Sequence, residues 1–156
     1  PLGDMLSLQV LDLSHNAITD IYPLGVQSGL RELDLGYNRL ATLDGMESLT
    51  ELENLYLAGN RIADIGALKK LSDLIEFDLS YNQVRSLAPL GGLTGLARIT
   101  LDGNPLDGIE LLRDFGELKL VSLKGVKGIP CMLIKQLESQ FGDDAVISDT
   151  DCETGL

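Results

Sequence analysis

The sequence predicts an α/β solenoid, a right-handed curved stack of short repeats with a parallel sheet on its concave face and turn or 3₁₀ segments on its convex face. Three observations support this prediction. The chain repeats with a period of 22 residues, each repeat carries the same frame of apolar residues, and each frame ends in an asparagine. The asparagines are Asn16, Asn38, Asn60, Asn82 and Asn104.

The first half of each repeat predicts a short strand. In LRELDLGYN, residues 30–38, apolar and polar residues alternate, which is typical of a strand with one buried face. The frame recurs as Leu8, Leu11 and Leu13, then Leu30, Leu33 and Leu35, Leu52, Leu55 and Leu57, Leu74, Phe77 and Leu79, and Leu96, Ile99 and Leu101. We therefore expect parallel strands that stack in register.

The second half of each repeat turns the chain back. Apolar residues recur there at every third position, as Leu40, Leu43 and Met46 do, and Pro23 and Pro89 lie in the equivalent segments. This spacing predicts a 3₁₀ or loosely helical segment. Because a repeat can bury its leucines only against its neighbours, stacking places the sheet on one side and the turns on the other.

The asparagine at the end of each frame has a structural explanation. Its amide carries donors and an acceptor, so it can satisfy backbone groups where the strand passes into the turn. In a stack of repeats these side chains form a ladder. An asparagine buried without such partners would destabilise the fold by about 1–3 kcal/mol.

The pattern LxxLxLxxN in all five repeats resembles that of the leucine-rich-repeat superfamily, in the 22-residue subclass typified by a regulatory subunit of protein phosphatase 1. The resemblance covers nearly the whole chain. It implies a horseshoe-like solenoid whose concave sheet binds another protein, and it does not imply an enzyme.

We expect a single leucine-rich-repeat domain over residues 1–156. Residues 8–117 form five repeats, and residues 118–156 form a degenerate sixth repeat and a C-terminal cap. Residues 1–7 fit the tail of a preceding repeat.

A preceding repeat is indicated because Leu2 stands one full period before Leu24 and so occupies the equivalent position of a repeat. This equivalence predicts that the chain is a piece of a longer array of repeats. The apolar edge at Leu2, Met5 and Leu8 would then have to be covered by further protein or by another chain. A cloning remnant at residues 1–3 is the alternative.

After residue 117 the spacing of the apolar residues continues, but the residues typical of the repeat are lost. Val121 and Leu123 occupy strand positions, but Val126 replaces the asparagine, which is typical of a capping repeat. Pro130 fits the first turn of a helix that runs through CMLIKQLESQF to Gly142, a suitable helix stop.

Cys131 and Cys152 are the only cysteines, and both lie in the cap. They form either a disulfide, which would stabilise a loop of this size by roughly 3 kcal/mol, or two unrelated thiols in a cytosolic protein. The stretch GIPCMLIKQLESQFGDDAVISDTDC also resembles the C-terminal cap of leucine-rich-repeat proteins exported by Gram-negative bacteria, where an IPC before a helix pairs with a later cysteine. That resemblance favours the disulfide and an extracellular, cell-surface or periplasmic location over a cytoplasmic one.

Residues between the leucines of each strand point away from the core and line the concave face. Aligned repeats place them in columns with rungs about 4.8 Å apart. The candidate binding residues are Asp12, Glu32, Asp34, Tyr37, Asn54, Tyr56, Glu76, Asp78, Tyr81 and Arg98. Because tyrosine is enriched among binding hot spots, the three tyrosines are the expected anchors. The alternative is a solvated acidic face that keeps the solenoid soluble.

Charge indicates the class of partner. The chain has 24 acidic and 12 basic residues, a net charge of −12 at pH 7 and a pI near 4.3. Such a surface repels phosphate backbones and anionic lipids, so we expect neither nucleic acid nor a membrane surface as partner. No apolar run is long enough for membrane insertion. We expect another protein, one with a basic patch.

No catalytic residue, cofactor or metal is expected. His15 is the only histidine, so a Ser-His-Asp triad has a single possible base. The zinc motifs HExxH and CxxC, the P-loop and GxGxxG do not occur. The carboxylate columns arise at every rung and imply no cleft for a glycosidase pair or a calcium ion.

The sequence thus predicts a non-catalytic protein–protein interaction module, part of a larger exported bacterial protein, that binds its partner on the concave face. Two alternatives stay open. One is an intracellular scaffold or phosphatase-regulatory subunit, which free thiols would support. The other is a structural spacer in a surface adhesin, which a concave face without ligands would support.

Overall fold

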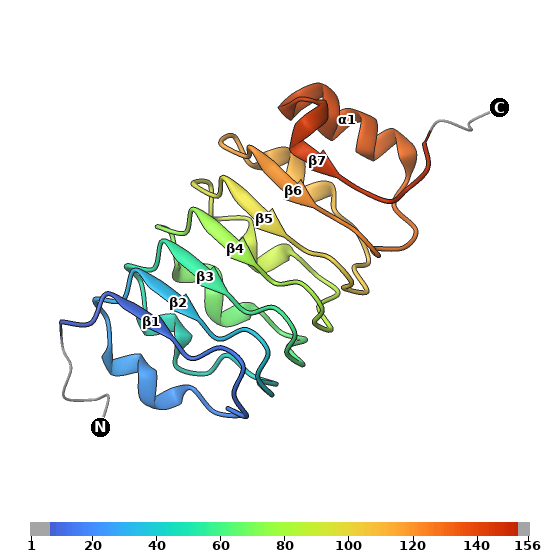
Figure 1. The fold of residues 1–156 in the computed structure, drawn as a ribbon. Coiled ribbons are helices and arrows are strands. Elements are labelled where there is room, and N and C mark those ends of the chain that lie inside the picture. The colour runs from blue at the N-terminus through green and yellow to red at the C-terminus, as the bar shows by residue number, and fades with distance from the viewer. Residues whose placement is uncertain (1–6, 153–156) are drawn as a thin grey trace.

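The computed structural model describes residues 7–152 and contains one parallel sheet whose strands follow in sequence order (Figure 1). The strands are β1 (Val10–Asp12), β2 (Glu32–Asp34), β3 (Asn54–Tyr56), β4 (Glu76–Asp78), β5 (Arg98–Thr100), β6 (Leu120–Ser122) and β7 (Val146–Ile147). The predicted solenoid is confirmed. The sequence also predicts the tail of a preceding repeat and an apolar edge at the N-terminal end of the solenoid. There Leu8 is half-buried, whereas Leu2 and Met5 lie outside the described residues.

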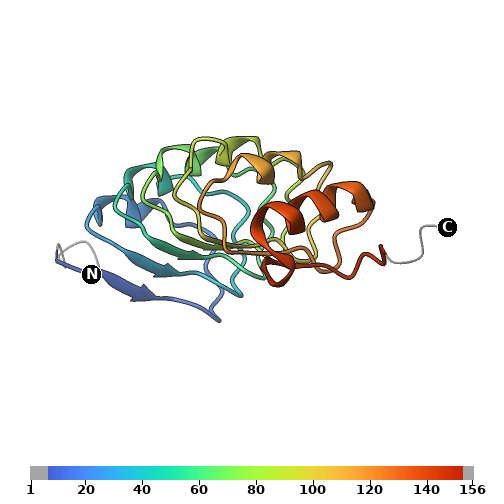
Figure 2. The same cartoon turned by 90° about the horizontal axis from the view of Figure 1, so that it is seen from above.

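Short 3₁₀ helices lie on the side opposite the sheet, as Figure 2 shows. They are η2 (Tyr22–Val26), η3 (Met46–Ser48), η4 (Gly66–Lys70), η5 (Ala88–Leu90) and η6 (Glu110–Asp114). Each returns the chain from one strand to the next, so the three-residue apolar spacing is confirmed as 3₁₀ structure. The leucines of both halves therefore face a common interior.

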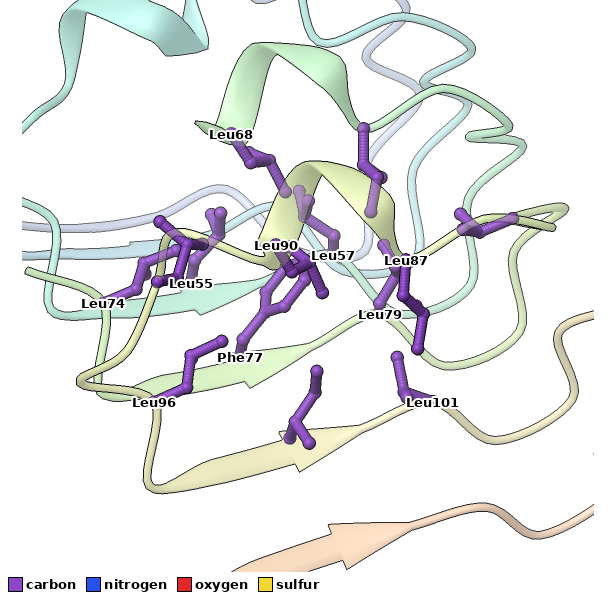
Figure 3. Close-up of a cluster of buried hydrophobic side chains, with 14 of the residues drawn as sticks. Leu55, Leu57, Leu68, Leu74, Phe77, Leu79, Leu87, Leu90, Leu96 and Leu101 are labelled. Carbon is purple, nitrogen blue, oxygen red and sulfur yellow. The ribbon is translucent and has the colours of Figure 1, made fainter. Parts of the chain in front are cut away.

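The core fills the space between the sheet and the 3₁₀ helices (Figure 3). Leu55 of β3 pairs in register with Phe77 of β4, which pairs with Ile99 of β5. All three side chains are at most 1% exposed. Burial of each such side chain contributes about 1.5–3 kcal/mol, and every repeat obtains it from its neighbours.

The asparagine ladder is confirmed at the ends of the strands. Asn60 donates its amide protons to the carbonyls of Leu35 and Leu57, both at 3.0 Å, and its side-chain oxygen accepts the N–H of Leu40 at 2.9 Å. The same bonds to the preceding repeat are made by Asn38, Asn82 and Asn104. Asn16 is exposed, and within the described residues its side chain bonds only to carbonyls of its own repeat.

The cap begins with the predicted helix, α1 (Cys131–Phe141). Pro130 is its N-cap in an extended conformation, with φ −64° and ψ 131°. It therefore lies just before the first turn, whereas the sequence predicted it within that turn. Proline lacks an N–H and cannot take part in an interior helical turn, which fits this position. Leu133, Ile134 and Leu137 are the buried side chains of the helix.

After α1 the chain passes through η7 (Asp143–Ala145) and adds β7 to the end of the sheet. Val146 pairs with Val121 of β6 in parallel and is 8% exposed. The structure joins Cys131 to Cys152 in a disulfide, with Cα atoms 5.3 Å apart. Both cysteines are half-buried, so Cys131 is not a core residue, and the bond connects the start of α1 to the segment that follows β7.

Candidate protein-binding face

Strand register brings the predicted binding residues together in two columns on the concave face. The glutamate column contains Glu32, Asn54, Glu76 and Arg98 on successive strands. The aspartate column contains Asp12, Asp34, Tyr56 and Asp78. Neighbouring members are register partners, so their side chains project from adjacent rungs about 4.8 Å apart.

The aspartates use one oxygen to hold the turn that follows each strand. Oδ1 of Asp34 accepts the N–H of Gly36 at 2.8 Å, and Oδ1 of Asp78 accepts the N–H of Ser80 at 2.9 Å and its hydroxyl at 2.6 Å. Within residues 7–152, the second oxygen of both carboxylates accepts no hydrogen bond. It is an acceptor available to a ligand, because a carboxylate offers lone pairs on both oxygens.

Asp12 repeats this arrangement at the first strand. Its Oδ1 accepts the N–H of Ser14 at 2.8 Å. The hydrogen bonds from the Ser14 hydroxyl and N–H, with a smaller effect of His15, lower the pKa of Asp12 below its usual 3.8. Asp12 is therefore ionised at neutral pH.

Tyr56 lies between Asp34 and Asp78 in the aspartate column and is half-buried. Its hydroxyl donates to the carboxylate of Glu76 at 3.4 Å. Burial raises the pKa of Tyr56 above its usual 10.0, and the charges of Glu76 and Glu32 raise it further. Burial is the larger cause, and the smaller contributions of Glu76 and Glu32 reflect negative charge around the third rung, the level of β3, since negative charge disfavours a phenolate.

Arg98 limits the acidic part of the face. Its guanidinium pairs with the carboxylate of Glu76 at 2.8 Å, and the two side chains are 59% and 31% exposed. An exposed pair of this kind contributes only about 0–1 kcal/mol to stability. Its main consequence is that the charge of Glu76 is compensated, whereas Asp12, Glu32, Asp34 and Asp78 form no ion pair with the described residues.

A third column, which we call the corner column, follows the strands directly before each asparagine position. It contains His15, Tyr37, Gly59, Tyr81, Gly103 and Gly125. All six have left-handed backbones, with φ of 55° to 56° at the three non-glycine residues and 67° to 72° at the glycines. A left-handed non-glycine residue costs roughly 1–2 kcal/mol, so this column favours glycine.

Aromatic rings in the corner column lie over the next residue of the column. The rings of His15 and Tyr37 stack with centroids 4.5 Å apart and an angle of 11° between planes. A Cβ atom on Gly59 would lie 2.7 Å from Cδ1 of Tyr37, and one on Gly103 would lie 2.7 Å from Cδ1 of Tyr81. The tyrosine rings therefore occupy the space that side chains at Gly59 and Gly103 would need.

Sequence reasoning placed Tyr37 and Tyr81 on this face but missed the partners of their rings. The sequence interpretation placed His15 in the same column as Tyr37, as an exposed polar residue at a corner, and the structure shows that its ring stacks on Tyr37. The available signal was the period itself, because His15 and Tyr37 stand in the same position of consecutive repeats.

Neither a metal-binding cluster nor a membrane-spanning helix is seen in the part of the chain that the structure describes. Residues 7–152 contain no group of three or more histidine, cysteine, aspartate or glutamate side chains arranged to hold a metal ion. None of the described helices is long and apolar enough to cross a membrane.

Comparison with known proteins places this geometry in context. The family model for the leucine rich repeat matches residues 7–62. Internalin C2 of Listeria monocytogenes is similar in structure, with a TM-score of 0.75 and 29% identity over 78% of this chain and 54% of that chain. The fold is a leucine-rich-repeat solenoid.

Two further structures resemble this solenoid. The leucine-rich-repeat ectodomain of a receptor kinase from Arabidopsis thaliana has a TM-score of 0.65 and 29% identity, covering 76% of this chain and 71% of that chain. A leucine-rich-repeat protein of Leptospira interrogans has a TM-score of 0.82 and 23% identity, covering 93% of this chain and 38% of that chain, and shows the fold alone. The comparison with curated proteins gives no match. The solenoid spans about half the length of internalin C2.

Proposed function

We propose that this solenoid is a non-catalytic protein–protein interaction module that binds a partner with a basic patch on its concave face. The observation that carries the proposal is the acidic and aromatic surface of the first four repeats. There the aspartate column lies beside two exposed tyrosines, Tyr37 and Tyr81, which are 52% and 61% exposed.

The chemistry of this surface suits protein recognition. The second oxygens of Asp34 and Asp78 can accept hydrogen bonds from lysine or arginine, and the net charge of −12 attracts a basic surface over longer distances. Exposed tyrosines supply contact area with few rotatable bonds, which is typical of hot spots. The face thus combines steering charges with rigid anchors.

We further propose that the chain is a single domain of a larger exported bacterial protein. The disulfide between Cys131 and Cys152 supports an oxidising compartment, because such bonds are rare in reducing cytosol. Similarity to internalin C2 and to a receptor ectodomain supports a location outside the cytoplasm. Mass spectrometry of protein purified without reductant should find no free thiols, and two free thiols would contradict this location.

Photo-crosslinking tests the concave face. A photoreactive amino acid placed at Asn54 on the face should capture a partner from extracts of the bacterial envelope or of host cells. The same group at Lys69, exposed in η4 on the opposite side, should not capture it. Identical products from both positions would contradict binding at the concave face, and no product from Asn54 would favour a structural spacer.

A charge variant makes this test specific. Asp34→Asn with Asp78→Asn keeps an oxygen that can accept the turn N–H groups of Gly36 and Ser80, and it removes two negative charges. The crosslink from Asn54 should weaken by about tenfold or more, since each charge-assisted hydrogen bond contributes about 1.5–3 kcal/mol. Unchanged capture would contradict a basic partner.

A further inference from the structure

Tyr37 and Tyr81 stand in equivalent positions of the corner column but differ in what covers their rings. One side of the Tyr37 ring stacks on His15, and the other side lies over Gly59. Tyr81 lies over Gly103 in the same way, but the preceding residue of its column is Gly59, which has no side chain. Among the described residues no aromatic ring stacks on Tyr81, which is 61% exposed. The ring face that His15 covers on Tyr37 is therefore open on Tyr81.

The interval between the two tyrosines suits one planar group. Tyr37 and Tyr81 are two rungs apart, which places their rings about 10 Å from each other. A planar group midway between the two rings lies about 5 Å from each of them, within the range of aromatic contacts. The stack of His15 on Tyr37, at 4.5 Å, is an example of such a contact in the same column.

The tyrosines are not required by the backbone at these positions. Gly59, Gly103 and Gly125 adopt the same left-handed conformation with φ of 67° to 72° and no side chain. Strained residues that the fold itself does not need are concentrated at functional sites. The exposed rings of Tyr37 and Tyr81 thus fit a role in binding.

Charges around the interval select a cation. The third rung holds Tyr56 between Asp34 and Asp78, and Asn54 beside Glu32. The carboxylate of Glu76, on the other side of Asn54, is already paired with Arg98. The second oxygens of Asp34 and Asp78 accept no hydrogen bond from the described residues. A planar group that carries negative charge would be repelled here, and a neutral one would leave these carboxylates without a partner.

We infer that the third rung receives an arginine side chain of the partner protein, with its guanidinium stacked on the open face of Tyr81 and hydrogen-bonded to a neighbouring aspartate. This inference rests on the proposed function and names the chemistry of its contact. Arginine fits better than lysine, because its plane stacks on an aromatic face while its fork of N–H groups donates to a carboxylate. Lysine offers charge without the plane.

Short blocked peptides rich in arginine, in lysine or in citrulline separate the contributions of charge and planarity. Lysine keeps the charge without the plane, and citrulline keeps the planar group without the charge. Binding is followed by NMR through the ring protons of Tyr81, with Tyr22 as reference, since Tyr22 is 70% exposed in η2 on the opposite side. The arginine peptide should bind more tightly than the other two and should shift the Tyr81 signals.

Matched variants locate the contact. Tyr81→Gly should weaken arginine-peptide binding by about three- to tenfold, as expected for loss of a cation–π contact. It should fold, because glycine already occupies the equivalent corners at Gly59 and Gly103. Tyr81→Phe keeps the ring and should bind like the wild type, as should Tyr22→Ser.

The outcomes separate this inference from the proposed function. Equal binding of lysine and arginine peptides, or unchanged arginine binding by the folded Tyr81→Gly protein, would overturn the inference and leave attraction by charge alone. If Asp34→Asn with Asp78→Asn abolishes partner capture while Tyr81→Gly does not, the acidic face functions without an arginine on Tyr81. If neither variant affects capture, the proposed function fails as well.

Discussion

The side-chain oxygen of Asn82 accepts the backbone N–H of Ile62 in the preceding repeat at 3.0 Å. The amide of Asn82 also donates to the carbonyls of Leu57 at 2.9 Å and Leu79 at 3.0 Å. Asn82 is 6% exposed, and its partners are buried. One side chain thus holds the corner of its own repeat and attaches it to the repeat before.

Replacing Asn82 by alanine should lower the free energy of unfolding by at least about 2 kcal/mol. The change leaves the buried N–H of Ile62 without its acceptor, and an unsatisfied buried group costs about 1–3 kcal/mol. Urea unfolding measures the loss. Asn16→Ala is the control, because Asn16 is exposed and should cost less than about 1 kcal/mol. Equal losses would contradict a ladder that depends on bonds between repeats.

Gly59→Ala and Gly125→Ala should differ although both place alanine in a left-handed conformation, at φ of 67° and 72°. Both variants carry the backbone cost of roughly 1–2 kcal/mol. Only the new Cβ at Gly59 meets a ring, 2.7 Å from Cδ1 of Tyr37, whereas the nearest atoms to one at Gly125 are 3.6 Å away. Gly59→Ala should therefore also shift the ring signals of Tyr37 and His15 in NMR spectra. Unshifted signals would contradict the packing of Tyr37 over Gly59.

Removing both cysteines, by Cys131→Ser with Cys152→Ser, should destabilise the cap by about 2–4 kcal/mol, as expected for a loop of this length. The rate of backbone hydrogen exchange should increase more in α1 than in β3 or β4, because the disulfide connects only elements of the cap. Reductant should reproduce the effect in the wild type and have none in the variant. A wild-type protein indifferent to reductant would argue against a stabilising disulfide.

Tyr56 should ionise above pH 10.0, because burial and the carboxylates of Glu76 and Glu32 raise the pKa of its hydroxyl. The difference in phenolate absorbance between the wild type and Tyr56→Phe isolates this titration. Glu76→Gln should move the midpoint down toward 10.0, since it removes a negative charge beside the hydroxyl.

The same shift has a consequence for stability. Since the folded pKa of Tyr56 exceeds the unfolded value, its contribution to stability is fully present below pH 10.0 and is lost as pH rises through the folded pKa. Tyr56→Phe should lack this part of the alkaline decline in unfolding free energy. A midpoint at or below 10.0 would contradict both the burial of Tyr56 and the negative charge around it, and a midpoint that Glu76→Gln leaves unchanged would contradict the contribution of Glu76.

The repeated pattern alone established most of the fold. A one-residue shift of a strand would turn its leucines to the solvent, so five copies of the same frame allow a single register. The asparagine ladder followed from the same logic, because a buried amide at a corner must find backbone partners. For these reasons the repeat alone determines the column that contains Asp34, Tyr56 and Asp78.

Tertiary structure decided what the pattern leaves open. Two cysteines allow a bond or two thiols, and the position of β7 beside β6 brings Cys152 to Cys131. Strand β7 has two residues, too few for a periodic signal, and exists through its pairing and the burial of Val146. The stack of His15 on Tyr37 and the open face of Tyr81 depend on left-handed corners and ring orientations. The residues of that stack are 22 positions apart in the sequence. Their contact depends on backbone and side-chain geometry, which the alternation of apolar and polar residues does not encode.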